Sequence, residues 1–523
     1  MWQQASTSVD RPYRVNASSF PIPGISASDV KYSVALALDT LTEQGGAAPF
    51  RYDGTTSLTQ LPTMLADCQA QNIDYNLVVV ADGSMTSTAG VYHARCRDPN
   101  NGMRGTRFEI FAYVDDNWAV GDASTGWDLV HNWVHEAIHS MNITHPSQTE
   151  GALVAQSGAL GTFQNNRGRD LYEYDLKCLE EIASFRNLTG TYRAHTNSVF
   201  GNANTLNDMD QDATTGSVGV TKNYVNNLGA WNVSSTYRNG SGVWRPTSNC
   251  CSKYIEFQPQ NTSGWYGAVW RENENMDRVF YSDWRDDVQY SNAAKDRERY
   301  LRSSNGFFNT SGSGQLSHCS IMNGFMQCSL TQGVFTGKKI AVAWDTYVNR
   351  SQTAWVNQNR LGNSSSREIF IATGHVNEWT LPTPFKTGLQ SNVSPGLACG
   401  GFLSAGNYDC VLAYVPQDDP LGRVKVRRFY SSQNSTNYTL QFDPNEFSVP
   451  FATTANSIAL WYHDGKYWLA IRSALIVGQP ILIYSSSDGA IWSYKQQGDE
   501  SDIGPSAVGY QETGTNYLSV WRH

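Results

Sequence analysis

Apolar residues in the first part of the chain recur with the periods of helices and buried strands. A helix is predicted over residues 26–42, where apolar positions return every three or four residues. Two apolar runs, 75–81 and 107–114, have the length and composition of buried strands. Further helices are predicted over about 126–141 and 171–185. This alternation of helices and strands predicts an α/β domain over residues 1–200.

The pattern changes after this domain. Residues 201–228 are rich in Asn, Thr, Gly and Asp, which is typical of a linker. Residues 229–523 have strand periodicity and little helical periodicity, so the second domain is expected to be all-β. The fold class predicted for the whole chain is therefore multidomain, as its 523 residues also require.

The all-β domain contains a repeated strand of small and aromatic residues. Its spacing is typical of propeller blades with insertions and predicts about five or six blades. A second recurring unit, a strand followed by a polar turn and an aromatic residue, occurs at 279–284, 369–379 and 481–492. Residues 232–244 look like this second unit without a repeated strand before it, and the chain closes with a repeated strand that no second unit follows. We expect these two segments to share one blade and close the ring. The repeated strand occurs at 267–270, 340–344, 411–414, 458–461 and 507–510.

Charge and hydropathy exclude some classes of partner. The net charge of −9 and the absence of a dense basic patch argue against nucleic acid. The chain has no apolar run of about 18 residues, so no membrane span is predicted. Its first residues lack the apolar core of a signal peptide, so an export signal would have to be removed or missing from this sequence.

Cysteines and glycosylation sequons nevertheless indicate a secreted, extracellular or cell-surface protein. Among nine cysteines, Cys319 with Cys328 and Cys399 with Cys410 are close enough in sequence to staple hairpins. The glycosylation candidates are Asn16, Asn187, Asn232, Asn239, Asn261, Asn309, Asn349, Asn363, Asn392, Asn434 and Asn437. A twelfth sequon, at Asn142, is expected to stay unmodified because a glycan there would crowd the site described next.

The segment 135–145 carries the candidate chemistry. In a helix, His135 and His139 lie one turn apart on one face, and both imidazoles can reach one ion. Glu136 lies beside them and can act as a base towards water. A chain that turns back after the helix would bring in His145, and Asn142 suits the left-handed position of that turn. Three imidazoles leave a fourth position open for water, as catalytic zinc requires.

This string, HExxHxxNxxH, resembles the zinc-binding motif of the metzincin peptidases, HExxHxxGxxH/D, with Asn142 in the glycine position. The resemblance covers roughly residues 20–190 and is nearest to the matrixin-like arrangement. It implies an upper subdomain with a twisted sheet and a lower subdomain after His145. The methionine that metzincins place in a turn beneath the metal is replaced, in the best-matching stretch, by Val154, and Met209 is a weaker substitute.

The resemblance implies a secreted zinc-dependent endopeptidase with one catalytic Zn²⁺, acting on extracellular proteins or glycoproteins. The alternative is a non-catalytic structural or adhesive glycoprotein that keeps the zinc scaffold. His131 lies on the same helical face but is expected near the ligands rather than among them. Asp115 and Asp116 could bind Ca²⁺, although an ordinary acidic turn accounts for them better.

The segment 486–492 resembles the Asp-box turn of sialidase-like propellers, one residue shorter than usual. This turn is a folding motif, so glycosidase activity is not expected from it. A binding role for the propeller, towards glycan or protein, is the expectation, because Trp and Tyr suit such contacts.

Overall fold

The computed structural model describes two parts of the chain with side chains, and strand backbones between them. The described residues of the first part are 11–43, 50–82, 90–120 and 127–140. Between 200 and 335 the description is limited to the backbones of strands. In the last part it covers 341–345, 350–357, 367–374, 384–400, 408–432, 439–501, 504–512 and 515–522.

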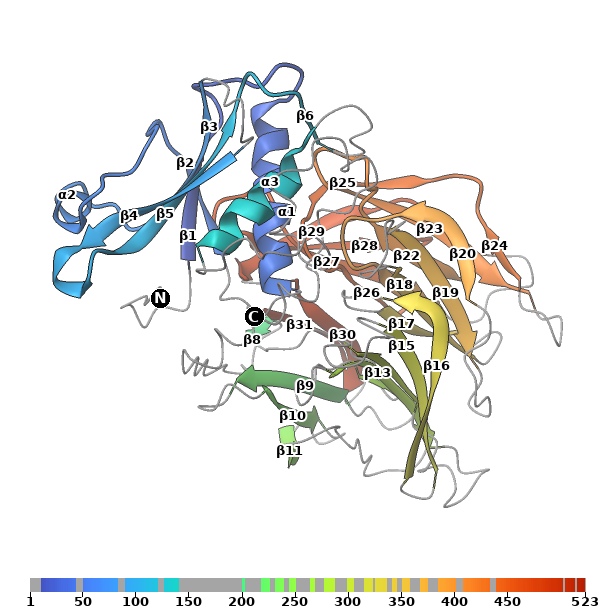
Figure 1. Ribbon diagram of the computed structural model, residues 1–523. Helices are drawn as coiled ribbons and strands as arrows, with labels where there is room; N and C mark the ends of the chain where they lie inside the picture. Colours follow the sequence, from blue (N-terminus) through green and yellow to red (C-terminus); the bar gives the residue numbers. More distant parts are fainter. Residues whose placement is uncertain are drawn as a thin grey trace.

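The first part is a five-stranded mixed sheet with helices (Figure 1). The strand order is β2-β1-β3-β5-β4; β1, β2, β3 and β5 run parallel, and β4 is antiparallel to β5 at one edge. The strands are β1 (Arg11–Asn16), β2 (Phe50–Thr55), β3 (Asn76–Ala81), β4 (Gly90–Asp98) and β5 (Arg104–Tyr113). The other elements are α1 (Ala27–Glu43), α2 (Leu65–Ala70), η1 (Pro99–Asn101), β6 (Trp118–Ala119), β7 (Trp127–Asp128) and α3 (Leu129–His139).

The two long helices form where periodicity predicts them, and side chains fix their starts. At α1, Ser26 and Asp29 cap each other, because the Asp29 amide donates to Ser26 Oγ and the Ser26 amide donates to Asp29 Oδ2. At α3, Asp128 Oδ1 accepts from the Val130 amide. The strands predicted at 75–81 and 107–114 are β3 and β5. The helix predicted over 171–185 lies outside the described residues.

The second part is all-β. Its strands form six successive sheets in the described chain, each mainly antiparallel. The first sheet contains β9 (Val218–Val225), β10 (Trp231–Arg238) and β11 (Trp244–Cys250), and the second contains β12 (Gly264–Ala268), β13 (Asp277–Asp286), β14 (Arg299–Ser304), β15 (Gln315–Met322) and β16 (Phe325–Phe335).

The third sheet contains β17 (Ala341–Asp345), β18 (Arg350–Val356), β19 (Glu368–Gly374) and β20 (Phe385–Gln390), and the fourth contains β21 (Gly396–Cys399), β22 (Cys410–Tyr414), β23 (Arg423–Ser431), β24 (Leu440–Phe442) and β25 (Phe447–Thr453).

The fifth sheet contains β26 (Ala459–His463), β27 (Lys466–Arg472), β28 (Pro480–Ser486) and β29 (Ser493–Glu500), and the sixth contains β30 (Ser506–Glu512), β31 (Thr515–Arg522) and β8 (Phe200–Asn202).

The sheets follow one another in a propeller-like order. The first strand of each sheet contacts the first strand of the next, in the order β12, β17, β21, β26 and β30. The other strands of each sheet follow on from this first strand. The last hairpin, β30–β31, is completed by β8, which pairs parallel with β31 (Figure 1). A segment that precedes the first sheet thus completes the last sheet, as expected. The prediction that residues 232–244 do so is wrong, because that segment contributes β10 to the first sheet and the last sheet is completed by β8.

Two further details differ from the sequence pattern. The range expected to be a linker contains β9 and most of β8. In the fourth sheet the repeated strand at 411–414 belongs to β22, the second strand, and the first strand is β21, whose GLAC sequence has the same small and apolar character.

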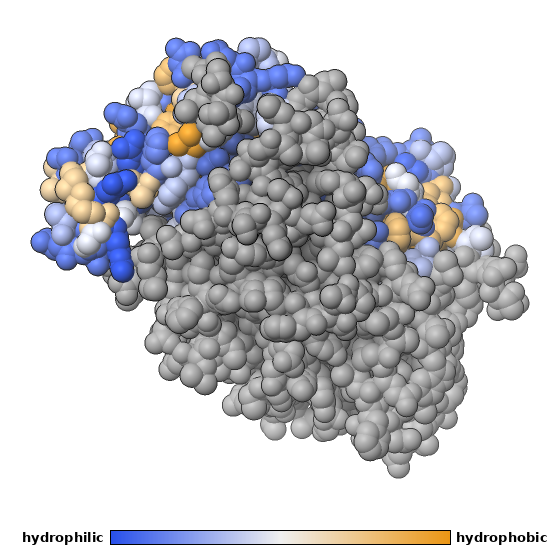
Figure 2. Space-filling model, viewed as in Figure 1, coloured by the Kyte–Doolittle hydropathy of each residue, from blue (hydrophilic) through white to orange (hydrophobic). Residues whose placement is uncertain are grey.

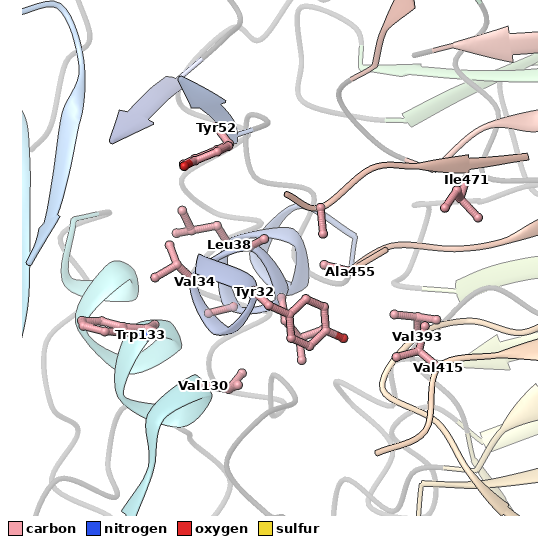
Figure 3. Close-up of a cluster of buried hydrophobic side chains, with 14 of the residues drawn as sticks. Tyr32, Val34, Leu38, Tyr52, Val130, Trp133, Val393, Val415, Ala455 and Ile471 are labelled. Carbon is pink, nitrogen blue, oxygen red and sulfur yellow. The ribbon is translucent and has the colours of Figure 1, made fainter. Parts of the chain in front are cut away.

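Helix α1 lies between the mixed sheet and the all-β part (Figures 1 and 3). Val34 and Leu38 of α1 share one hydrophobic core with Trp133 of α3 and with Val415 and Ile471 of the all-β part. This helix is therefore buried on both sides and belongs to the core of both parts.

Close approach at this interface requires a glycine. Gly422 has a φ of 67°, and a Cβ atom there would lie 2.0 Å from Cε2 of Tyr32 on α1. The all-β part therefore packs directly against the ring of Tyr32. Any larger side chain at position 422 would clash with that ring and would also be strained in the left-handed region.

A buried arginine ties the two parts together. The Arg472 guanidinium, at the end of β27, donates to Asp39 Oδ1 of α1 at 2.7 Å, and both side chains are almost fully buried. It also donates to the carbonyl oxygens of Phe50 and Ser501 and to Gln479 Oε1. One side chain thus joins α1, the start of β2 and two segments of the all-β part.

The surface is more polar than this core. On the face shown in Figure 2, the described residues are mainly hydrophilic, with small and separate hydrophobic areas. No helix among the described residues is long and apolar enough to cross a membrane.

The Arg472→Ala variant is expected to lose about 3–5 kcal/mol of stability, because it leaves the Asp39 carboxylate buried without its cation. The loss is measured as the shift of the denaturant midpoint multiplied by the slope of the unfolding transition. The control is Arg51→Ala, which breaks an exposed pair with Glu500 across the same interface and should cost at most about 1 kcal/mol. Equal shifts for the two variants would contradict a central role for Arg472.

Candidate functional site

Helix α3 presents two histidines and a glutamate at its C-terminal end. The Nε2 atoms of His135 and His139 are 3.2 Å apart, and their rings are nearly perpendicular. Ligand nitrogens that share a tetrahedral zinc at 2.0–2.1 Å are roughly 3.3 Å apart. The two imidazoles therefore stand as two ligands of one ion would, although the same separation also suits a hydrogen bond between the rings.

Glu136 is buried beside these histidines, with 7% of its surface exposed. Burial raises the pKa of its carboxyl to about 8, since the charged form loses solvation. Its charge also acts on Tyr113, whose pKa is raised mainly by burial and further by Glu136. Tyr113 is the last residue of β5, so the Glu136 carboxyl group acts on the end of that strand. A positive charge beside Glu136 would lower the pKa of this carboxyl.

Hydrogen bonds set the position of α3. Trp133 Nε1 donates to Ser33 Oγ of α1 at 2.9 Å, and Asn132 Nδ2 donates to the Phe111 carbonyl oxygen of β5 at 3.1 Å. The first bond fixes α3 against α1, and the second fixes it against the sheet. Both partners are buried, so the histidine pair is held on a rigid base.

The edge strand β4 passes beside the histidines. The ring of Tyr92 lies 6.3 Å from that of His139, centroid to centroid, and also contacts Phe108. Strand β4 pairs with β5, and among the described residues the backbone-to-backbone hydrogen bonds of 90–95 run to β5 alone. The Ala94 carbonyl oxygen also accepts from Arg97 Nε at 3.3 Å. Tyr92 carries no motif, so sequence reasoning missed it; its place beside His139 depends on the pairing of β4.

Other residues predicted for this site have different outcomes. His145, Asn142 and Val154 lie outside the described residues. Within the described ranges no cluster of three or more potential metal ligands occurs. The His131 ring lies 5.9 Å from that of His135, one turn earlier on the same face, where it was expected.

The disulfides are described in part. Cys399 is bonded to Cys410, as their spacing predicted. Cys319 and Cys328 are register partners in the β15–β16 hairpin, and their side chains lie outside the described residues. A third pair, Cys68 with Cys96, was missed, because 28 residues separate the two cysteines and no short hairpin connects them.

Two acidic motifs are turns in the structure. Asp115 and Asp116 follow β5, and the Asp116 amide donates to the Tyr113 carbonyl oxygen. In the Asp-box segment, Asp488 Oδ1 accepts from the amides of Ala490 and Ile491, and the buried Trp492 donates through Nε1 to the Gly489 carbonyl oxygen. This network connects β28 to β29 and supports the interpretation of the segment as a folding motif.

Comparisons with known proteins add only distant likenesses. No protein-family model and no curated protein matches the chain. Among solved structures, the SapL1 lectin in complex with alpha methyl fucoside is 11% identical, with a TM-score of 0.30 over 55% of this chain and 94% of that one. The Hadza microbial sialidase Hz136 is 11% identical, with a TM-score of 0.34 over 61% and 65%. A GH43_1 enzyme from Xanthomonas citri is 9% identical, with a TM-score of 0.26 over 65% and 96%.

Each of these TM-scores lies below 0.5, so the function of this chain is inferred from its own residues.

Two glycosylation candidates are buried in the structure. Asn16 is fully buried, and its Nδ2 donates to the Leu58 carbonyl oxygen. Asn392 is 1% exposed, donates to two backbone carbonyl oxygens and accepts from Arg367. A glycan on either nitrogen would replace these bonds and could not fit in the core. The side chains of the remaining candidates lie outside the described residues.

We therefore expect Asn16 and Asn392 to remain unmodified in protein expressed with glycosylation. Peptide mass spectrometry after enzymatic deglycosylation measures occupancy at each sequon. The other candidates serve as internal controls, since modification at any of them shows that the expression host was competent. A glycan found on folded protein at Asn392 would contradict the burial of its amide.

Proposed function

We propose that this protein is a secreted zinc-dependent endopeptidase of the metzincin type, with the catalytic site on α3. The observation that carries the proposal is the placement of His135 and His139 with their Nε2 atoms 3.2 Å apart, next to Glu136 and beside the edge strand β4. The cysteines fit this location, because the disulfides Cys68–Cys96 and Cys399–Cys410 persist in oxidising compartments.

The donor set fits zinc. Two imidazoles one helical turn apart, with nitrogens at the separation of neighbouring tetrahedral ligands, are typical of such sites. His145 is the third ligand in this proposal, as the resemblance implies. Bound zinc would supply a Lewis acid and would make water more acidic at neutral pH.

Glu136 is the residue that moves protons in the proposed reaction. Its carboxylate takes a proton from the attacking water as oxygen bonds to the peptide carbonyl carbon. It then gives that proton to the amide nitrogen, and the C–N bond breaks. Its burial on a helix fixed to both α1 and β5 keeps the carboxylate in one position relative to the histidines.

An extended peptide is the substrate that suits the surroundings of α3. Among the described residues, 90–95 of β4 make backbone-to-backbone hydrogen bonds to β5 alone, and Tyr92 of this stretch lies against His139. A peptide that pairs with a sheet edge gains backbone hydrogen bonds whatever its sequence. A peptide bound in this way would lie beside the histidines.

The Glu136→Gln variant should lower the cleavage rate of a generic protein substrate about 10²–10⁴-fold, because the amide cannot accept the proton. Zinc content, measured by mass spectrometry of the purified protein, should stay at one ion per chain. The matched control is Glu500→Gln, the same chemical change at an exposed carboxyl on β29, which should keep full activity.

The same measurement separates the two proposed classes of function. If zinc-loaded wild type and Glu136→Gln behave alike, the alternative holds: a non-catalytic extracellular glycoprotein that keeps a zinc scaffold. In that case the metal site is tested by zinc content alone, which should fall in the His135→Ala variant.

A binding role for the all-β part is a second proposal, supported by its exposed apolar side chains. Phe451 is 94% exposed and Tyr494 is 50% exposed, and such rings are suited to sugar faces or protein partners.

A glycan array probed with the full-length protein is expected to show binding that Phe451→Ala or Tyr494→Ala weakens about two- to twelvefold, since a stacked aromatic contributes about 0.5–1.5 kcal/mol. Ser432→Ala, a change at a half-buried hydroxyl directly after β23, is the control. Silence of the wild type on the array would contradict glycan binding and leave a protein partner.

A further inference from the structure

The side chain of Asn132 lies on the same face of α3 as the proposed site. Residues three and four positions apart are neighbours on a helix, and Asn132 precedes His135 by three residues and Glu136 by four. The Asn132 side chain is buried, and its Nδ2 donates to the Phe111 carbonyl oxygen of β5 at 3.1 Å. The face of α3 that carries His135 and Glu136 is therefore fastened to the sheet about one turn before them.

A glycine lets the neighbouring strand close on this carboxamide. Gly90 begins β4 and pairs with Ala112, the residue after Phe111. A Cβ atom at position 90 would lie 2.0 Å from Asn132 Oδ1 and 2.8 Å from Asn132 Cγ. The Asn132 carboxamide thus touches both strands of the β4–β5 pair. Any side chain at position 90 would have to displace it from its hydrogen bond.

The contact between β4 and α3 continues to the histidines. Tyr92 follows Gly90 by two residues and so points to the same side of the strand, and its ring lies 6.3 Å from that of His139. His139 follows Asn132 by about two turns on one face of the helix. The strand therefore runs along the helix face that carries the site, with the Gly90–Asn132 contact at its start.

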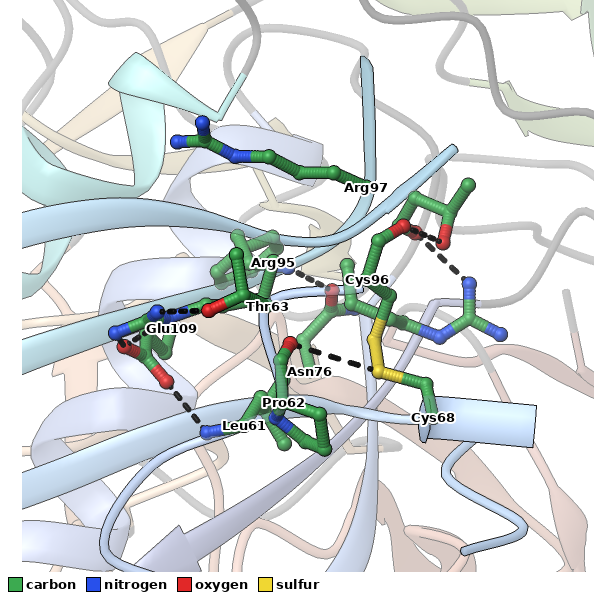
Figure 4. Close-up of a disulfide and its surroundings, with 12 residues drawn as sticks. Leu61, Pro62, Thr63, Cys68, Asn76, Arg95, Cys96, Arg97 and Glu109 are labelled. Carbon is green, nitrogen blue, oxygen red and sulfur yellow. Dashed lines mark hydrogen bonds and ion pairs between the residues drawn. A yellow bond between two sulfur atoms is a disulfide. The ribbon is translucent and has the colours of Figure 1, made fainter. Parts of the chain in front are cut away.

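Strand β4 is held in place by contacts that do not involve α3. It pairs with β5 along its length, and Cys96 near its end is bonded to Cys68 of α2 (Figure 4). Arg95 also forms an ion pair with the buried Glu109 of β5. A clash or a gap beside Gly90 is therefore expected to move α3 and not β4.

A second anchor lets α3 turn without leaving the core. Trp133 Nε1 donates to Ser33 Oγ of α1, and Trp133 points about 100° around the helix axis from Asn132. Two anchors in different directions fix the rotation of a helix, and one does not. Loss of the Asn132 anchor would leave Trp133 to hold α3, and the helix could then turn about that bond.

We infer that Asn132 is a positioning residue of the proposed zinc site. Its carboxamide, held between the Phe111 carbonyl oxygen and the backbone of Gly90, fixes the rotation of α3 and thereby the directions of the His135 and His139 imidazoles. This inference rests on the proposed zinc peptidase function. Since the residue acts through the helix, its removal should impair zinc binding more than it impairs the fold.

The Asn132→Ala variant should bind zinc about 10- to 100-fold more weakly, as is typical when a residue that orients metal ligands is removed. Affinity is measured by competition with a chelator, on the full-length protein. Cobalt(II) is the second probe, because its visible absorption depends on the geometry of its ligands. The variant's cobalt spectrum should differ from that of the wild type.

A double variant tests the contact itself. Gly90→Ala should weaken zinc binding by a similar factor, because the added methyl group displaces the Asn132 carboxamide. In the Asn132→Ala background the same change should cause no further loss, since the atoms that it meets are gone. Such non-additivity is expected only of residues that act through one contact.

Gly105→Ala is the matched control. It adds the same methyl group to the same strand pair, at the other end of the ladder, where its Cβ would lie 2.8 Å from that of Ala94. It should lower the denaturant midpoint and leave the zinc affinity and the cobalt spectrum unchanged. If Asn132→Ala does not fold, the comparison of Gly90→Ala with Gly105→Ala decides.

The outcomes separate this inference from the proposed function. Wild-type zinc affinity in Asn132→Ala, or equal losses of affinity in Gly90→Ala and Gly105→Ala, would overturn the positioning role and leave the zinc peptidase intact. A wild-type protein that binds no zinc would overturn both.

Discussion

The Arg472 guanidinium is the point through which the two parts of this chain become one structure. It is buried, and a buried charge is stable only where a counter-charge and hydrogen-bond acceptors surround it. Asp39 supplies the charge from α1, and backbone carbonyl oxygens at Phe50 and Ser501 supply acceptors from both parts. Neither part alone provides this environment. The α/β unit and the all-β part are therefore expected to depend on each other for their stability.

The same contact extends to the histidine helix through α1. One side of α1 carries Asp39 and Tyr32 towards the all-β part, and Ser33 accepts a hydrogen bond from Trp133 of α3. Two residues after Trp133 comes His135. The position of the candidate metal ligands is thus set by a stack of three layers, in which α1 is the middle layer and has little freedom to shift.

Periodicity was enough to predict α1, α3, β3 and β5, because each has a continuous apolar face or run and the helices have capping residues. The His135–His139 geometry followed from helical spacing alone. The partners of these elements could not be predicted in this way. Asp39 and Arg472 are 433 residues apart, and β4, with its polar sequence and a φ of 50° at Cys96, carries no clear alternation. Residues 61–63 bind the end of β4 through backbone carbonyl oxygens, which have no sequence signature.

The two edges of the mixed sheet are covered by different parts of the chain. At β2, the Tyr52 amide donates to Gln479 Oε1 and the Tyr52 carbonyl oxygen accepts from the Gly478 amide, so the all-β part covers that edge. At β4, the covering residues come from the α/β unit itself, since the Cys96 and Arg97 amides donate to the carbonyl oxygens of Pro62 and Thr63. An exposed edge invites unwanted pairing, and proteins generally cover it. The all-β part is therefore needed to close the edge at β2, and the end of β4 is closed without it, which is a second reason for the dependence of the two parts on each other.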